Sequence, residues 1–483
     1  MPNTNQRLLN GNSANRLILA LILAVAALLR FQNLDRTSLW YDEAVSWSQS
    51  KGTIAELLTA VAADNYPPLH NILLWLTMPL AGDSETALRL PSVLLGVLAV
   101  WLIFLTGKTL AGNTTGLLAA ALLTVSPFHI WYSTEARMYA LLATCGLAFL
   151  LLVLKSLERP SAWRLVALGV TGALFLYSHI YALLGFASVG VVCGILALTG
   201  ILKSGRNSLT NAVLVCLAMA ASALAFLPWL IILAMRARSV AEEGFWIAYP
   251  DPTFLINIAF SMAGSLPLFW VLAGLAVASL LTVVHLPGRY FGKPQSADAI
   301  LVCFAYTVGP PLLAYLYSIS VQPILFDRYL IAAWPGLVLL ASVTAQRLAP
   351  QVAPIALFAA AIWLSFPELK FTLLERIRPE WRLIARDYLE QKADGDHLLL
   401  FKGFAAPALS YYLRDPNTFT PVDTIAEINK GTADARWLLI VHTSSEELSK
   451  AQEAFAPREG TPAARRFGWG ASGLTLLERG PVE

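Results

Sequence analysis

The chain has 483 residues, of which 57% are hydrophobic and only 13% charged, with a mean hydropathy of +0.61 and a net charge of +3. Soluble domains carry about a quarter charged residues, so this composition excludes an ordinary soluble protein and indicates a multi-pass membrane protein. The basic residues are scattered along the chain, which argues against a nucleic-acid-binding surface.

Eleven apolar segments match the thickness of the bilayer core and are predicted to be membrane helices. Their expected ranges are 15–31, 88–108, 114–131, 137–155, 163–179, 181–202, 210–235, 254–285, 298–319, 328–346 and 351–369. The first segment is expected to stay as a helix because no small-residue cleavage site follows it. The segment 254–285 is long for one span, so a short re-entrant or interfacial piece is expected around Gly264–Pro267.

Lys and Arg are modestly enriched in the short loops on the N-terminal side, which favours a cytoplasmic N-terminus. With eleven crossings, the loop 32–87 and everything after Pro367 then face outward. We therefore expect residues 1–369 to form a transmembrane domain in the cytoplasmic (inner) membrane. Residues 370–483 are expected to form a small soluble α/β domain on the periplasmic or extracellular side.

The long outer loop and the C-terminal region have recognisable local patterns. Within the loop, Thr53–Ala63 is typical of an amphipathic helix and Leu69–Leu80 of a more apolar helix that lies in the interface. After about Lys370 the charges increase and the apolar runs shorten to strand length. The expected strands are His397–Phe401, Trp437–Val441 and Leu474–Leu477, and the expected helices are Glu380–Gln391 and Ser444–Phe455.

Asp42 and Glu43 stand about ten residues after the first apolar segment, directly behind Trp40 and Tyr41. Trp and Tyr settle at the membrane–water interface, where ionisable groups are costly and tend to be kept for function. A carboxylate pair suits general-base chemistry on an acceptor hydroxyl. The alternative is that one of the two acids caps the helix that follows.

Several polar clusters fall on the same predicted side of the membrane, each at an outward helix end, as an outward-facing active site would require. The clusters are Asp42–Glu43, Tyr66–His70, Glu135–Tyr139, Ser178–Tyr181, Glu242–Glu243 and Asp327–Tyr329. Arg137 and Arg328 suit an anion, because guanidinium groups bind phosphate bidentately and stay charged in apolar surroundings. Their alternative is an interfacial arginine paired to a lipid headgroup or to Glu135 or Asp327. His70 and His179 also fit a structural role.

Four segments resemble the GT-C glycosyltransferases, in particular the protein O-mannosyltransferase and lipid A aminoarabinose transferase group. The similar segments are Leu39–Glu43, Tyr66–Leu69, Ser84–Ser92 and Tyr132–Tyr139, and Asp327–Leu330 with Trp334–Gly336 is similar to a later signature. The resemblance implies a GT-C-like fold and transfer of a sugar from a polyprenyl-phosphate donor to an acceptor hydroxyl, with inversion. It also implies that Asp42 is the base and Glu43 its ordering neighbour. Arg137, Tyr139 and Arg328 would hold the lipid phosphate, with Tyr66, His70, Glu135 and Tyr329 as further substrate contacts.

Other functions remain open from the sequence. A transporter or flippase of lipid-linked sugars would also need many helices and polar residues, but it predicts deep charges in several spans or a repeat with broken helices. An inactive assembly scaffold is the third possibility. No cofactor is required, although paired carboxylates could bind a divalent cation. The expected partners are a lipid-linked sugar donor, membrane lipids and an acceptor that is a lipid, a glycan or a protein.

Overall fold

The computed structural model describes residues 4–32, 34–64, 66–204, 210–243, 247–285, 295–376, 378–431, 435–441, 444–455, 463–467 and 473–479. The chain forms two compact units. The first comprises residues 1–32, 52–80 and 89–375, and the second residues 33–51, 81–88 and 376–483. The boundary therefore falls after Glu375 rather than at 369, and two pieces of the loop 32–87 fold with the C-terminal region.

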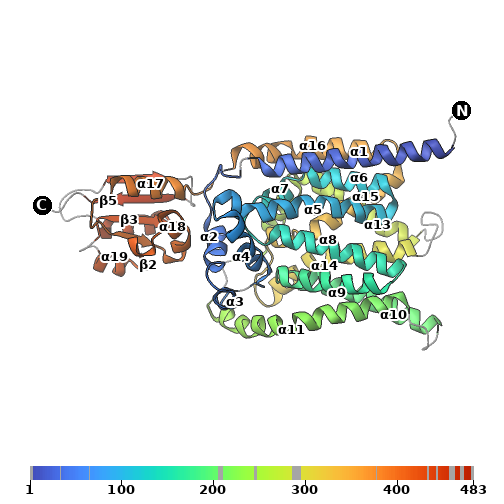
Figure 1. The fold of residues 1–483 in the computed structure, drawn as a ribbon, viewed down its shortest axis with the longest axis horizontal. Coiled ribbons are helices and arrows are strands. Elements are labelled where there is room, and N and C mark those ends of the chain that lie inside the picture. Colours follow the sequence, from blue (N-terminus) through green and yellow to red (C-terminus); the bar gives the residue numbers. More distant parts are fainter. Residues whose placement is uncertain are drawn as a thin grey trace. The chain divides into compact units, whose positions relative to one another are not determined.

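The first unit is a helical bundle, with its helices side by side in Figure 1. The helices that make up its predicted spans are α1 (Thr4–Phe31), α5 (Glu85–Ala111), α6 (Asn113–Thr124), α7 (Pro127–Ser133), α8 (Tyr139–Glu158), α9 (Ala162–Ser178), α10 (Ala182–Ser204), α11 (Asn211–Glu243), α12 (Pro252–Ala263), α13 (Leu266–His285), α14 (Gln295–Ser320), α15 (Ala333–Leu348) and α16 (Ala353–Lys370). Every one of the eleven predicted segments is largely helical. Among the described residues, eight helices are long and apolar enough to cross a membrane, or nine if α6 and α7 count as one span. This count is lower than the eleven predicted spans because α9 and α15 have only 17 and 16 residues, which is short for a membrane span.

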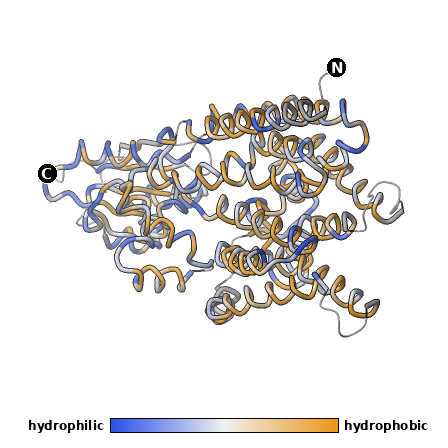
Figure 2. The backbone as a smooth tube through the Cα atoms, turned by 45° about the vertical axis from the view of Figure 1, so that its right-hand side comes forward, coloured by the Kyte–Doolittle hydropathy of each residue, from blue (hydrophilic) through white to orange (hydrophobic). Residues whose placement is uncertain are grey.

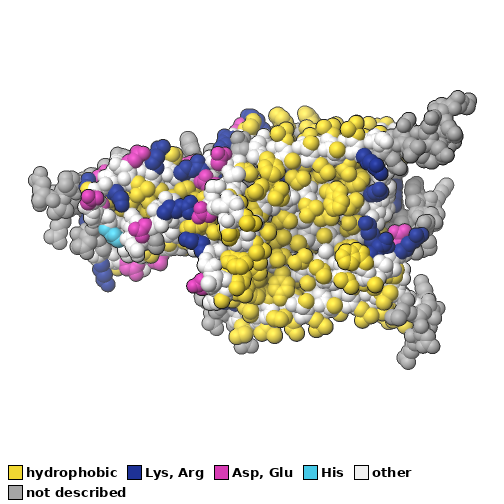
Figure 3. All heavy atoms as spheres, viewed as in Figure 1, with side chains coloured by type: hydrophobic (Ala, Val, Ile, Leu, Met, Phe, Trp, Pro, Cys, Tyr) yellow, Lys and Arg dark blue, Asp and Glu magenta, His cyan; other side chains and the backbone are white. Residues whose placement is uncertain are grey.

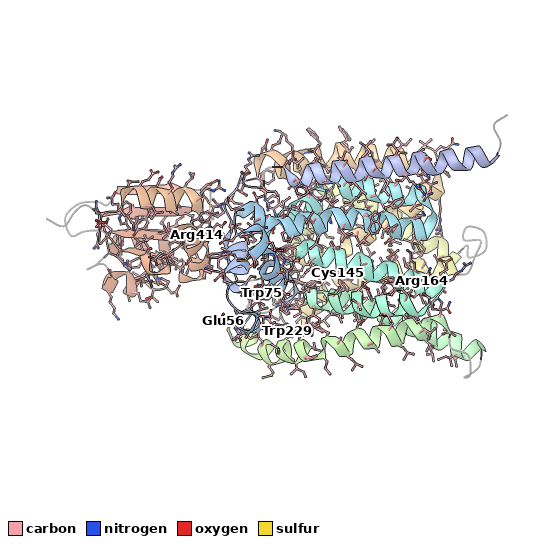
Figure 4. The ribbon with its side chains drawn as sticks, in the orientation of Figure 1. Glu56, Trp75, Cys145, Arg164, Trp229 and Arg414 are labelled. Atoms are coloured by element: carbon pink, nitrogen blue, oxygen red, sulfur yellow. The ribbon has the colours of Figure 1, made fainter. Side chains whose placement is uncertain are left out.

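The surface of this unit agrees with a membrane setting. Hydrophobic residues run along the helices in Figure 2, and hydrophobic side chains cover the flank of the bundle in Figure 3. Lys and Arg side chains gather at one end of it. Arg164 lies at that end, whereas Trp75 of α4 and Trp229 of α11 lie toward the opposite end (Figure 4). The described cysteines are free thiols, and Cys145, Cys193 and Cys303 are buried.

Two predicted spans are broken. The segment expected as one helix over 114–131 bends by 66° between α6 and α7. Ser126 caps α7 by accepting from the His129 N–H, and Pro127 occupies its first turn, so the chain restarts rather than continues. The segment 254–285 breaks where α12 ends at Gly264, whose φ is +74°. That break confirms the interruption expected around Gly264–Pro267.

Three short helices precede α5. α2 (Tyr41–Gln49) belongs to the second unit, whereas α3 (Ile54–Ala62) belongs to the first and α4 (Leu69–Ala81) lies almost wholly within it. Thr53 and Glu56 form a reciprocal capping box that starts α3. These helices confirm the two predicted within the first outer loop.

The second unit is an α/β fold around a five-stranded sheet with strand order β2-β1-β3-β5-β4. Its strands are β1 (Leu398–Phe401), β2 (Phe419–Val422), β3 (Trp437–Val441), β4 (Ala463–Phe467) and β5 (Leu474–Glu478), and its helices are α17 (Trp381–Gln391), α18 (Ala406–Leu413), α19 (Ile425–Gly431) and α20 (Ser445–Phe455). β1 runs parallel to β2 and β3, whereas β5 runs antiparallel to β3 and β4. One face of the sheet packs on α17 and α18 and the other on α19 and α20. The predicted soluble α/β domain is confirmed.

Candidate active site

A non-helical turn between α7 and α8 carries two of the predicted residues of the first unit. Glu135 and Arg137 lie in this turn and are both buried. The predicted helix 137–155 begins two residues later than expected, at Tyr139. The carbonyl oxygen of Arg137 accepts a hydrogen bond from Ser92 Oγ of α5 at 3.3 Å, which fixes the turn against that helix.

Arg137 lies over the ring of Tyr66, with its Cζ atom 5.1 Å from the ring centroid. A guanidinium over an aromatic face is attracted by the ring quadrupole, most strongly where water is excluded. Burial raises the pKa of Tyr66 well above its usual range, and the charge of Arg137 opposes that rise only in part. Tyr66 therefore stays a neutral hydroxyl beside a permanent cation. The structure brings these two predicted site residues together.

His179 lies at the end of α9, close to the start of α8. Its ring is 6.3 Å from Tyr139 and 5.0 Å from Tyr329, between centroids. Burial, and to a smaller extent the charges of Arg137 and Arg328, lower the pKa of His179 from 6.5 to about 3. Its Nδ1 accepts from the Tyr181 N–H at 3.1 Å, so the proton of the neutral ring is on Nε2. His179 is thus a neutral N–H donor flanked by two cations.

Arg328 comes from a short 3-10 helix, η1 (Asp327–Leu330), which precedes α15. The predicted helix 328–346 therefore starts later, at Ala333, because η1 turns tightly first. Asp327 accepts from Ser261 Oγ at 2.5 Å and from the Arg328 N–H at 2.6 Å, and these bonds fix the turn. The Cζ atom of Arg328 lies 5.9 Å from the Tyr139 ring and 5.6 Å from the Tyr329 ring.

Arg137, His179 and Arg328 come from three distant parts of the sequence and meet at one end of the bundle. Arg137 precedes α8 and Arg164 follows it, so this is the end away from the basic residues seen in Figure 3. Two guanidinium groups and a neutral N–H donor within aromatic walls suit a phosphate. A charge-assisted hydrogen bond is about twice as strong as a neutral one, and low polarity around it strengthens it further.

Asp42 and Glu43 lie in the second unit, in the first turn of α2. Glu43 is fully buried and accepts from Arg378 Nη1 at 2.6 Å and from the Trp40 N–H at 3.2 Å. The alternative that one of the two acids caps the following helix is therefore confirmed for Glu43. Asp42 is half-buried, and its carbonyl oxygen accepts from Ser46 Oγ. The two neighbouring carboxylates thus stand in different environments.

His70 and the Glu242–Glu243 pair are the remaining predicted positions. His70 is buried in the first turn of α4, after Pro67–Pro68. The side chains of Glu242 and Glu243 lie outside the described part of the structure. Within the described residues, no group of three or more His, Cys, Asp or Glu side chains could hold a metal ion.

His179 and Arg378 are not among the site residues predicted from the sequence. His179 could have been identified from its place in the Ser178–Tyr181 cluster. That cluster lies at a predicted helix end on the same side as Glu135–Tyr139, which contains Arg137. Arg378 lies in a charged stretch after the last span, and no motif around it indicates a role in the site. Its role depends on a partner 335 residues away.

Residues 65–232 match the family model described as dolichyl-phosphate-mannose-protein mannosyltransferase. Among curated proteins, none matches the sequence. ArnT from Cupriavidus metallidurans in the apo state is similar in fold, with a TM-score of 0.64 at 14% identity over 95% of this chain and 97% of that one. ArnT bound to undecaprenyl phosphate gives 0.63 at 14% identity with the same coverage.

The archaeal oligosaccharyltransferase AglB from Archaeoglobus fulgidus, in complex with an inhibitory peptide and a dolichol-phosphate, is also similar. Its TM-score is 0.60 at 10% identity over 89% of this chain and 70% of that one. At these identities the likeness is one of fold. The chain is therefore a multi-pass membrane protein with the fold of the GT-C glycosyltransferases, and its residues 65–232 match the dolichyl-phosphate-mannose-protein mannosyltransferase family.

Proposed function

We propose that this protein is a glycosyltransferase that moves a sugar from a polyprenyl-phosphate donor to an acceptor hydroxyl at the outer face of the cytoplasmic membrane. The observation that carries this proposal is the convergence of Arg137 and Arg328 on the buried, neutral His179. A lipid phosphate is an anion that remains at the membrane boundary, so its binding groups belong at one end of a helical bundle. ArnT with undecaprenyl phosphate and AglB with a dolichol-phosphate support a donor of this class.

In the proposed reaction the bond from the anomeric carbon to the phosphate oxygen breaks, and the phosphate leaves with the electron pair. Negative charge grows on the phosphate as this bond lengthens. Preplaced cations that interact more strongly with that growing charge lower the barrier. Arg137 and Arg328 supply the charge, and Tyr139 and Tyr329 complete the walls around it. His179 adds a neutral N–H donor and does not itself take up a proton in the reaction.

The acceptor oxygen attacks the anomeric carbon from the face opposite the phosphate, so the configuration inverts. Asp42 takes the proton of the acceptor hydroxyl as the new bond forms, and a positioned general base contributes about 10²- to 10⁴-fold to the rate. Glu43 is committed to Arg378 and to the Trp40 N–H, so its part is to order the loop. Tyr66, His70 and Glu135 are proposed as further substrate contacts.

The test uses purified protein in detergent with lipid and a panel of radiolabelled polyprenyl-phosphate hexoses and pentoses. Wild type is compared with Asp42→Asn and Arg137→Ala, and with Arg164→Ala as a control at the exposed opposite end of the bundle. We expect release of lipid phosphate by wild type and the control, no release by Asp42→Asn, and reduced release by Arg137→Ala at donor concentrations below its raised KM. Unchanged release by Asp42→Asn would remove the proposed base. Binding of the lipid without turnover would favour transport.

A further inference from the structure

Asp42 belongs to the second unit, which therefore determines its position. The inference below rests on the proposed transferase function. The segment 33–51 contains α2 and is part of that unit. Ala44 of α2 is fully buried in the same core as Trp381 and Leu398. The helix that carries Asp42 is therefore integrated into the C-terminal fold.

Aromatic contacts hold both ends of α2. The ring of Tyr41 meets that of Phe404 edge to face at 5.2 Å, and the ring of Trp47 meets that of Tyr411 edge to face at 5.0 Å. Such pairs add about 0.5–1.5 kcal/mol beyond the area they bury. They hold the helix against the C-terminal fold at both ends, and polar contacts on either side of Asp42 add to them.

Arg378 supplies those polar contacts. Its guanidinium donates to Glu43 at 2.6 Å, and its Cζ atom lies 5.5 Å from the ring centroid of Trp40. The same Glu43 carboxylate accepts the Trp40 N–H. Arg378 therefore contacts the residues on both sides of Tyr41 and Asp42. The side chains of this ion pair are 6% and 0% exposed, so water does not substitute for either partner.

A second set of bonds holds the chain on either side of α2. Arg382 bonds to Glu85 and to the carbonyl oxygen of Asp35. Tyr412 accepts from the Leu39 N–H at 2.6 Å and donates to Glu85 at 2.5 Å. These contacts attach the loop to the C-terminal fold, whereas the contacts of Arg378 are made at the turn that bears the acid.

We infer that Arg378 is a positioning residue of the proposed transferase, which fixes the Asp42 carboxylate by holding Glu43 and Trp40 on its two sides. The C-terminal α/β unit then contributes directly to turnover, because it supplies the group that orients the base. A buried pair of this kind is weak evidence for added stability, and its best-supported use is to select one arrangement. A displacement of about 1 Å at a reacting group can lower a rate about 10²-fold.

The experiment compares Arg378→Met and Arg378→Lys with a matched control, Arg436→Met. Arg436 lies in the same unit and bonds to Asp396 and Glu478, away from α2. We measure kcat and the KM for the donor separately, together with hydrogen exchange of residues 41–49. Arg378→Met should lower kcat about 10²-fold, leave KM within about twofold and accelerate exchange in α2. Arg378→Lys should recover most of kcat, and Arg436→Met should keep both kcat and the exchange of α2.

The outcomes separate this inference from the proposed function. Unchanged exchange in α2 of Arg378→Met overturns the inference whether or not the protein transfers sugar. Accelerated exchange with an unchanged kcat overturns it as well. If Arg378→Met does not fold, Glu43→Gln combined with Arg378→Met removes the unpaired buried charge. That double variant should fold and still turn over slowly, and a wild-type kcat in it would contradict the inference. Absence of transfer by wild type would overturn the proposed function alone.

Discussion

Arg30 donates to Nδ1 of His129 at 2.8 Å, and this bond joins the end of the first helix to a residue 99 positions later. The same guanidinium donates to the carbonyl oxygens of Leu123 and Thr124 at the end of α6. A helix end within an apolar bundle leaves carbonyl groups that need donors. Arg30 therefore makes the bend between α6 and α7 possible.

The first prediction concerns this arginine. Arg30→Met removes the donors of the bent pair, and leaving a buried polar group unsatisfied costs about 1–3 kcal/mol. We expect a clear loss of thermal stability in detergent, measured by unfolding with a thiol-reactive dye. Arg16→Met, on an exposed position of the same helix, is the control and should unfold near the wild-type temperature. Equal stability of the two variants would contradict this account.

Gly264 gives a second prediction about the broken span. Its φ is +74°, and an added Cβ would lie 3.1 Å from Ser365 Cβ and 3.2 Å from Pro127 Cγ. Gly264→Ala should cost the roughly 1–2 kcal/mol of a left-handed residue plus the cost of this crowding. Gly82→Ala shares the positive φ, at +82°, but has no atom within 4 Å of the new Cβ. A larger loss of melting temperature for Gly264→Ala is expected, and equal losses would exclude the crowding.

His179 gives a prediction about pH. Because its pKa is lowered to about 3, the unfolded chain binds a proton below pH 6.5 that the folded chain does not. Folding stability should therefore fall by about 1.4 kcal/mol per pH unit as the pH drops from 6.5 toward 3. His179→Gln lacks this group, so its melting temperature should fall less than that of wild type between pH 7 and pH 5. Parallel curves for the two proteins would show that His179 is not held neutral.

The two arginines of the proposed phosphate site give the fourth prediction. Arg137→Lys keeps the charge but loses the planar, bidentate geometry, so it should bind the donor more weakly. Hydrogen bonds to charged groups contribute about 1.5–3 kcal/mol, which corresponds to a rise in donor KM of about 10- to 100-fold for Arg137→Ala or Arg328→Ala. Direct titration of a polyprenyl phosphate by calorimetry checks this result. Wild-type affinity in Arg328→Ala would remove that residue from the site.

Hydropathy predicted the helical segments because length and apolar composition are local properties. It missed the bend at Ser126 because that bend depends on Arg30, which is distant in sequence. The start of α15 was placed too early because η1 is stabilised by Ser261, another distant residue.

In the candidate site too, properties of single residues could be predicted from the sequence, whereas properties that depend on residues far away in the sequence could not. Arg137 and Arg328 could be proposed from residue chemistry and their place at helix ends. His179 was recognised but not assigned, because its state depends on burial and on both arginines. The partition of the first outer loop could not be predicted either, because residues 33–51 find their packing partners only after residue 376.

This partition has a consequence for synthesis. Ribosomes make the segment with α2 early, but its buried partners, Arg378 and the core that encloses Ala44, are made more than 300 residues later. The segment 33–51 can therefore reach its folded state only after residues 376–483 have been made. A chain stopped at Glu375 would keep its membrane helices and leave Asp42 on a segment with no fold to join. Folding of the segment that carries Asp42 thus depends on synthesis of the last domain.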